Sequence, residues 1–156
     1  MGNLLTYLPI FIATGVASYI SLIDIREMRI PNRVLLPGIL VTILSMFLVG
    51  FIDGSINRAL IALLGGTLSL ALFFLIHLLS PTGLGMGDVK FSALIGSALS
   101  WISFPLGLIG LGISFIASSL FSLIIFVVKR KSLKRVIPFA PFMLAGLLFV
   151  ELGLFV

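Results

Sequence analysis

The stretch from Phe91 to Val128 contains no charged residue. As one α-helix it would be about 57 Å long, whereas the hydrocarbon core of a bilayer is about 30 Å thick. It therefore holds either one helix that is too long or two that are barely long enough, and Phe104-Pro105 is the natural point of division. Because 60% of the 156 residues are hydrophobic and only 10% are charged, a small soluble core cannot hide this much apolar surface. We expect a polytopic membrane protein.

Other apolar runs long enough to cross a bilayer lie on both sides of this stretch. Three come before it, at Leu4 to Ile23, Val34 to Ile52 and Ala59 to Leu79, and one follows it, from about Val136 to Val156. No Lys or Arg precedes the first run, so we expect a retained helix there and not a cleaved signal peptide.

Positively charged residues decide the number of helices, because Lys and Arg collect in cytoplasmic loops. One basic cluster, with three arginines, follows the first run, and a second lies between Lys129 and Arg135. Both clusters fall on one side of the membrane only if the uncharged stretch holds two helices, and Arg58 is then the only basic residue outside. We predict an all-α membrane protein, with residues 1–156 forming a single domain of six transmembrane helices. Both termini are expected on the non-cytoplasmic side.

Composition also excludes several classes of site. The chain has no Cys and one His, which rules out a disulfide framework and a thiolate metal site, so we expect neither a metal nor another cofactor. The net charge is +5, but no basic stripe is interleaved with exposed aromatic residues. We therefore expect the basic residues to interact with membrane lipid and not with nucleic acid.

The five acidic residues are few enough for each position to be informative. Asp24 ends the first apolar run and Asp88 precedes the uncharged stretch, and the six-helix topology places both at the cytoplasmic face, with Asp53 at the opposite face. Two aspartates can hydrolyse a peptide without a metal when one is ionised and activates water while the other keeps its proton. Close approach of like charges enforces that division. Two ordinary interfacial aspartates, paired with Lys or Arg, are the alternative.

Three segments, in this order, resemble the motifs of type IV prepilin peptidases, a family of membrane aspartyl proteases. Asp24 is followed by a basic stretch and Ile30-Pro31-Asn32, and Gly85-Met86-Gly87-Asp88 matches the G-x-G-D signature. The third segment, Ile137-Pro138-Phe139-Ala140-Pro141-Phe142, carries Ala140 where the family usually has Gly. The resemblance extends from the first apolar run to the last, and three ordered motifs are more specific than any one of them.

The resemblance implies a membrane aspartyl endopeptidase that removes the short basic leader of type IV prepilins or related pseudopilins. Cleavage would occur after a glycine at the cytoplasmic face of a prokaryotic inner membrane, with Asp24 and Asp88 as the catalytic pair. The residues expected to bind substrate or shape the site are Gly85, Gly87, Lys90, Pro31, Asn32, Pro138, Phe139 and Pro141.

Larger members of this family also methylate the new N-terminus, and they carry an additional N-terminal region, often with paired cysteines. This sequence has no Cys, its first apolar run starts at once, and no glycine-rich strand-to-helix turn for a methyl donor is found. We expect peptidase activity without methyltransferase activity.

Several side chains keep two interpretations. In one interpretation Lys90 interacts with the charge of Asp88 or with the substrate carbonyl; in the other its side chain extends to the lipid headgroups. Glu27 either receives the positive charge of the leader or is a solvated loop residue. His77 either touches the aspartates or is an interfacial histidine with no catalytic part. Phe139 either forms a wall of the site or sets the entry of the last helix.

Other functions stay open as alternatives. A preflagellin-type peptidase and a presenilin-like intramembrane protease share the G-x-G-D signature with this chain. A small proton- or cation-coupled transporter belongs to another class, since intramembrane acids can bind ions. The two aspartates lie at one face and no inverted repeat with broken helices is evident, which counts against transport.

Overall fold

The computed structural model describes residues 4–80, 83–129 and 138–153. Within them the chain forms helices and no strand. The elements are η1 (Leu4–Tyr7), a short 3₁₀-helix, and the α-helices α1 (Leu8–Glu27), α2 (Asn32–Ile52), α3 (Ile56–Leu79), α4 (Met86–Ile102), α5 (Phe104–Lys129) and α6 (Ala140–Leu152). The predicted all-α fold, with six α-helices in this part of the chain and a break before Phe104, is confirmed.

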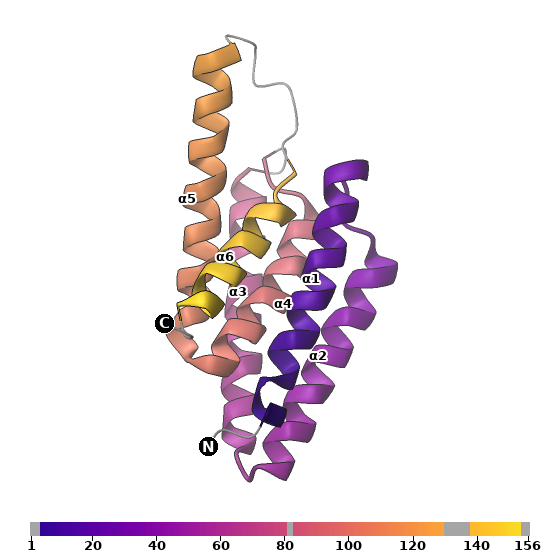
Figure 1. The fold of residues 1–156 in the computed structure, drawn as a ribbon. Coiled ribbons are helices and arrows are strands. Elements are labelled where there is room, and N and C mark those ends of the chain that lie inside the picture. The colour runs from indigo at the N-terminus through magenta and orange to yellow at the C-terminus, as the bar shows by residue number, and fades with distance from the viewer. Residues whose placement is uncertain (1–3, 81–82, 130–137, 154–156) are drawn as a thin grey trace.

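The helices alternate in direction along one bundle (Figure 1). Helices α1, α3 and α5 end at the upper end of the bundle in that view, where α2, α4 and α6 begin. The lower end holds η1, the α2–α3 turn and the α4–α5 junction. Asp24 and Asp88 therefore belong to the upper end, as expected, and Asp53 at the end of α2 belongs to the lower end.

Four helical segments are long and apolar enough to cross a membrane: Leu5–Glu27, Asn32–Ile52, Ile56–Leu79 and Phe104–Ile124. The other two helices, α4 and α6, have 17 and 13 residues, or about 26 and 20 Å, and are shorter than the hydrocarbon core. The protein is therefore a multi-pass membrane protein, with four full-length spans in the described residues.

The expected start of the last helix near Val136 is wrong, because α6 begins at Ala140. Pro141 lies in its first turn, where a missing backbone N–H is tolerated. The helix ends at Leu152. The basic residues from 130 to 135, which carry part of the topology prediction, lie outside the described residues.

Helix α4 is the centre of the bundle and packs against all five other α-helices. It approaches α3 closely because both helices carry small residues at the contact: a Cβ added at Gly66 of α3 would lie 2.9 Å from the carbonyl oxygen of Ala93 and 2.9 Å from the Cβ of Ser97. Small residues of this kind let helix backbones pack tightly where lipid removes the usual hydrophobic driving force.

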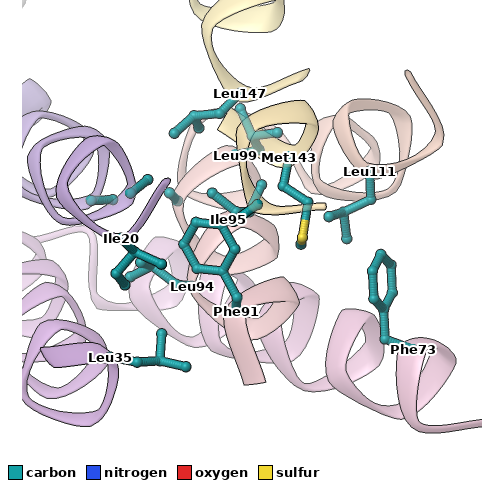
Figure 2. Close-up of a cluster of buried hydrophobic side chains, with 14 of the residues drawn as sticks. Ile20, Leu35, Phe73, Phe91, Leu94, Ile95, Leu99, Leu111, Met143 and Leu147 are labelled. Atoms are coloured by element: carbon teal, nitrogen blue, oxygen red, sulfur yellow. The ribbon is translucent and has the colours of Figure 1, made fainter. Parts of the chain in front are cut away.

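Buried apolar side chains from every α-helix surround α4 (Figure 2). Those labelled in the figure are Phe91, Leu94, Ile95 and Leu99 of α4 with Ile20, Leu35, Phe73, Leu111, Met143 and Leu147 of its neighbours. This packing fixes the axial position of α4, and hence the position of Asp88 in its first turn.

A polar network closes the lower end. The Arg58 Nε donates to the Trp101 carbonyl oxygen at 2.7 Å, and the guanidinium lies 4.7 Å from the centre of the Trp101 ring. The indole Nε1 of Trp101 donates to the Thr6 carbonyl oxygen at 2.8 Å, and the Thr6 hydroxyl donates to Asp53 at 3.1 Å. These contacts join η1, α2, α3 and α4 at the end of the bundle away from Asp24.

Candidate active site

Asp24 lies in the last turn of α1, just before Met28 ends the helix in a left-handed conformation with φ of 54°. Its side chain is buried, with 5% of its surface exposed. Asp24 Oδ2 accepts a hydrogen bond from the backbone N–H of Ala140 at 3.1 Å. Ser21, one turn earlier, donates to the carbonyl oxygen of the same Ala140 at 3.1 Å. The first and third motifs are thus joined through both backbone groups of one residue.

Phe139 holds the third motif against the bundle. Its ring centre lies 5.1 Å from that of Phe115 on α5 and 6.2 Å from that of Phe73 on α3, in tilted geometry. Pro138 and Pro141 lie on either side of Phe139 in the sequence and are half-buried. Phe139 therefore fixes the entry of α6, which keeps the Ala140 N–H on Asp24.

Asp88 lies inside α4, as its third residue, so this helix begins five residues before the uncharged stretch that starts at Phe91. Gly85 is the N-cap, and its backbone N–H donates to Asp88 Oδ2 at 3.1 Å. An acidic residue at this position commonly satisfies the N-cap N–H in this way, and it also meets the positive end of the helix dipole. The G-x-G-D motif is therefore a helix start, with a half-buried carboxylate in the first turn.

The first and second motifs touch each other at two points. A Cβ added at Gly87 would lie 2.9 Å from the Cβ of Ile30, so glycine permits the close approach of α4 to the segment that leads into α2. The Lys90 ammonium donates to the side-chain oxygen of Asn32 at 3.1 Å. Pro31, the N-cap of α2, has its carbonyl oxygen bonded to Leu35 N–H in the first turn. Lys90 thus makes its polar contact with Asn32, which neither of its two interpretations anticipated.

The surroundings of Asp88 favour its protonated form. The pKa of Asp88 is raised to about 6: burial is the main cause, the negative charge of Asp24 adds to the rise, and the hydrogen bond from Gly85 opposes it. The helix that carries Asp88 is not among the four membrane spans.

Two side chains with open interpretations lie at the edge of this arrangement. His77, in the last turn of α3, has Nδ1 2.6 Å from the carbonyl oxygen of Leu84, on the segment that leads to Gly85. Glu27 forms an ion pair of 2.9 Å with Arg29, and their side chains are 50% and 76% exposed. That exposure favours a solvated Glu27.

A polar contact between α1 and α6 was not predicted from the sequence. The Thr14 hydroxyl donates to Glu151 Oε1 at 2.6 Å, near the middle of the first membrane span. An acid inside the last apolar run was the available signal, because ionisable residues in membrane segments commonly serve function or pairing. Within the described residues no group of three or more His, Cys, Asp or Glu could hold a metal ion.

The fold and the three converging motifs define a polytopic membrane protein with two aspartates at one end of a helical bundle. The sequence matches the model of the type IV leader peptidase family over residues 11–136, and the chain belongs to that family. The matched range includes Asp24 and Asp88 and ends before Pro138. The resemblance drawn from the motifs is confirmed.

Curated relatives carry the name prepilin leader peptidase/N-methyltransferase. The protein from Aeromonas salmonicida (strain A449) is 27% identical over 138 residues, which cover 87% of this chain and 46% of that protein. The protein from Aeromonas hydrophila is 28% identical, with the same coverage. The chain spans about half the length of the curated relatives it matches. No solved structure matches it.

Proposed function

We propose that this chain is an aspartic endopeptidase that removes the leader peptide of type IV prepilins or pseudopilins, with Asp24 and Asp88 as its catalytic pair. The observation that carries the proposal is the convergence of the three motifs on these carboxylates. The third motif donates its Ala140 N–H to Asp24, and Gly87 packs the start of α4 against Ile30. Family membership supports the substrate class.

The proposed reaction uses one proton shared by the two carboxyl groups. The ionised carboxylate accepts a proton from water, which attacks the carbonyl carbon of the scissile peptide, and the protonated carboxyl donates a hydrogen bond to the carbonyl oxygen. The raised pKa of Asp88, about 6, supports such a state at near-neutral pH. The two groups titrate as a pair, so a pH–rate profile reports the macroscopic values of both.

The N–H groups around the pair supply the rest of the site. The bonds from Ala140 and Gly85 each hold one carboxyl oxygen, and the Phe139 backbone also bonds Asp24. The first turn of α4 also directs its positive dipole end toward charge that develops in the transition state.

The proposed orientation places the upper end of the bundle at the cytoplasmic face of a prokaryotic inner membrane. Arg26, Arg29, Arg33 and Lys90 belong to that end and Arg58 to the other, as the distribution of positive charge in membrane proteins favours. The basic leader would then enter from the cytoplasm while the apolar segment of the substrate lies in the bilayer. Both termini of residues 1–156 are placed on the far side.

We also propose that residues 1–156 carry the peptidase reaction alone. The relatives' name includes N-methyltransferase, whereas residues 1–156 contain neither a Cys nor a glycine-rich strand-to-helix turn for a methyl donor. Incubation with prepilin and a labelled methyl donor tests this point: cleaved but unlabelled product is expected, and a labelled N-terminus would contradict it.

The experiment for the main proposal is cleavage of a prepilin in liposomes by Asp24→Asn and Asp88→Asn. Asp53→Asn, at the lower end, is the matched control because it makes the same chemical change away from the motifs. We expect the control to cleave and both motif variants to be inactive. Full activity in either motif variant would overturn the proposed pair. Cleavage of a panel of prepilin, preflagellin and intramembrane substrates by the parent protein tests the substrate class.

A further inference from the structure

The peptide group between Leu84 and Gly85 is hydrogen-bonded on both sides. Its carbonyl oxygen lies 2.6 Å from His77 Nδ1, and its N–H donates to Asp88 Oδ2 at 3.1 Å. Since a carbonyl oxygen can only accept, the first bond requires the proton on Nδ1. One planar unit therefore connects the imidazole at the end of α3 with the carboxyl group at the start of α4.

Such a connection has an electrostatic consequence. A donor on the carbonyl oxygen withdraws electron density from the peptide N–H, and bonds linked in this way strengthen one another by roughly 10–30% each. A stronger N–H donor stabilises the ionised carboxylate that accepts from it. The imidazole thus acts on Asp88 without touching it.

The same bond restrains the segment before α4. Gly85 is an extended N-cap with φ of −74° and ψ of 152°, and the peptide that precedes it must keep one orientation for its N–H to face Asp88. Leu84 is buried, and its N–H lies 3.4 Å from the Ser80 carbonyl oxygen, a weak bond. The short bond from His77 fixes the orientation of the Leu84 carbonyl group, and with it the direction of the Gly85 N–H.

We propose that His77 is a positioning residue for cleavage, which orients the Leu84–Gly85 peptide and strengthens the hydrogen bond that this peptide donates to Asp88. The inference rests on the proposed function. Other charged or titratable groups in the described residues of this end include Asp24, Arg26 and Glu27 on α1, Arg29 before α2, Arg33 on α2 and Lys90 on α4. Arg29 is paired with Glu27, and Lys90 is bonded to Asn32.

Two substitutions at His77 separate the hydrogen bond from simple packing. His77→Asn keeps an N–H donor close to the Nδ1 position, whereas His77→Leu keeps a similar volume and loses the donor. Each full-length variant is reconstituted in liposomes, and kcat and KM for a prepilin are measured across pH.

We expect His77→Leu to lower kcat by about threefold to tenfold with KM nearly unchanged, because one hydrogen bond is removed from the positioning of Asp88. The limb of the pH–rate profile that Asp88 dominates should move to higher pH, by about 0.3 unit or more. His77→Asn should retain most of the parent's kcat and a similar pH–rate profile. Equal loss in both variants, or no change in either, would overturn the inference.

A readout independent of catalysis is the amide proton shift of Gly85, followed by NMR with glycine labelled. The shift should move upfield in His77→Leu and stay near its original position in His77→Asn, because it reports the polarisation of that N–H. An unchanged shift in folded His77→Leu would refute the link to Asp88.

If Asp88→Asn cleaved normally, the proposed function would fail, but the Gly85 amide shift would still test the hydrogen bonds of the Leu84–Gly85 peptide. If His77→Leu does not fold, His77→Phe serves as the second variant without a donor.

Discussion

Substitution of Gly87 by alanine tests how closely α4 must approach the first motif. The added Cβ would lie 2.9 Å from the Cβ of Ile30, whereas carbon atoms in ordinary contact are about 3.5–4.0 Å apart. The start of α4 and the segment before α2 must therefore separate by about 0.6–1.1 Å. Since the contact is made by Cβ itself, shortening Ile30 to alanine would not relieve it.

This displacement acts directly on Asp88, which follows Gly87 in the chain. A misplacement of about 1 Å at a reacting group can cost about 100-fold in rate, so we expect kcat for prepilin cleavage to fall by about 10- to 100-fold. Overpacking costs about 1–3 kcal/mol, partly offset by the better helix propensity of alanine, about 0.5–1 kcal/mol. The net loss of stability should be about 0–2.5 kcal/mol, which does not unfold the protein and so does not account for the loss of rate.

The matched control is Gly15→Ala on α1, where an added Cβ meets no atom within 4 Å. It should retain kcat and stability, measured by cleavage kinetics in liposomes and by unfolding in detergent mixtures. Normal cleavage by Gly87→Ala would refute the claim that close packing of α4 on Ile30 places Asp88.

Three further predictions concern stability. The pKa of Asp88 is raised from 3.8 to about 6, chiefly by burial, so the folded state binds the proton more tightly and loses stability as pH rises through this range. Asp88→Asn should therefore be more stable than the parent at pH 7, by of order 1–3 kcal/mol, and this gain should vanish below about pH 4. A gain in stability that does not depend on pH would contradict the raised pKa. A double-mutant cycle with Thr14→Val and Glu151→Leu should give a coupling of about 0.6–1.7 kcal/mol, and additivity would show that their bond contributes nothing. Arg58→Ala should lose about 1–3 kcal/mol of stability with kcat unchanged, because its bonds to Trp101 lie at the lower end; a large loss of kcat would refute this separation.

The sequence predicted the bundle because membrane spans follow simple rules of length and charge. The uncharged stretch had to be divided to keep the basic clusters together, and the break before Phe104 lies where that argument placed it. The alternating directions of the helices then bring Asp24 and Asp88 to one end, although 64 positions separate them. The start of α4 at Met86 was not predicted, although Gly85 can serve as an N-cap and Asp88 as its hydrogen-bond partner.

The contacts within the site could not be predicted, since they depend on backbone groups. The donor to Asp24 is the N–H of Ala140, a group that every residue except proline carries, so no residue type signals it. His77 likewise binds a carbonyl oxygen and not an aspartate. Glu151 was visible as an acid in an apolar run, but only the packing of α6 on α1 reveals Thr14 as its partner.

The most direct test of the central claim is the cleavage rate of Asp24→Asn, Asp88→Asn and the double variant on one prepilin in liposomes. Catalytic groups that act as a unit are strongly non-additive, so each single variant should be about as slow as the double variant. Losses that multiply in the double variant, or substantial cleavage by either single variant, would show that the two aspartates do not share one catalytic step.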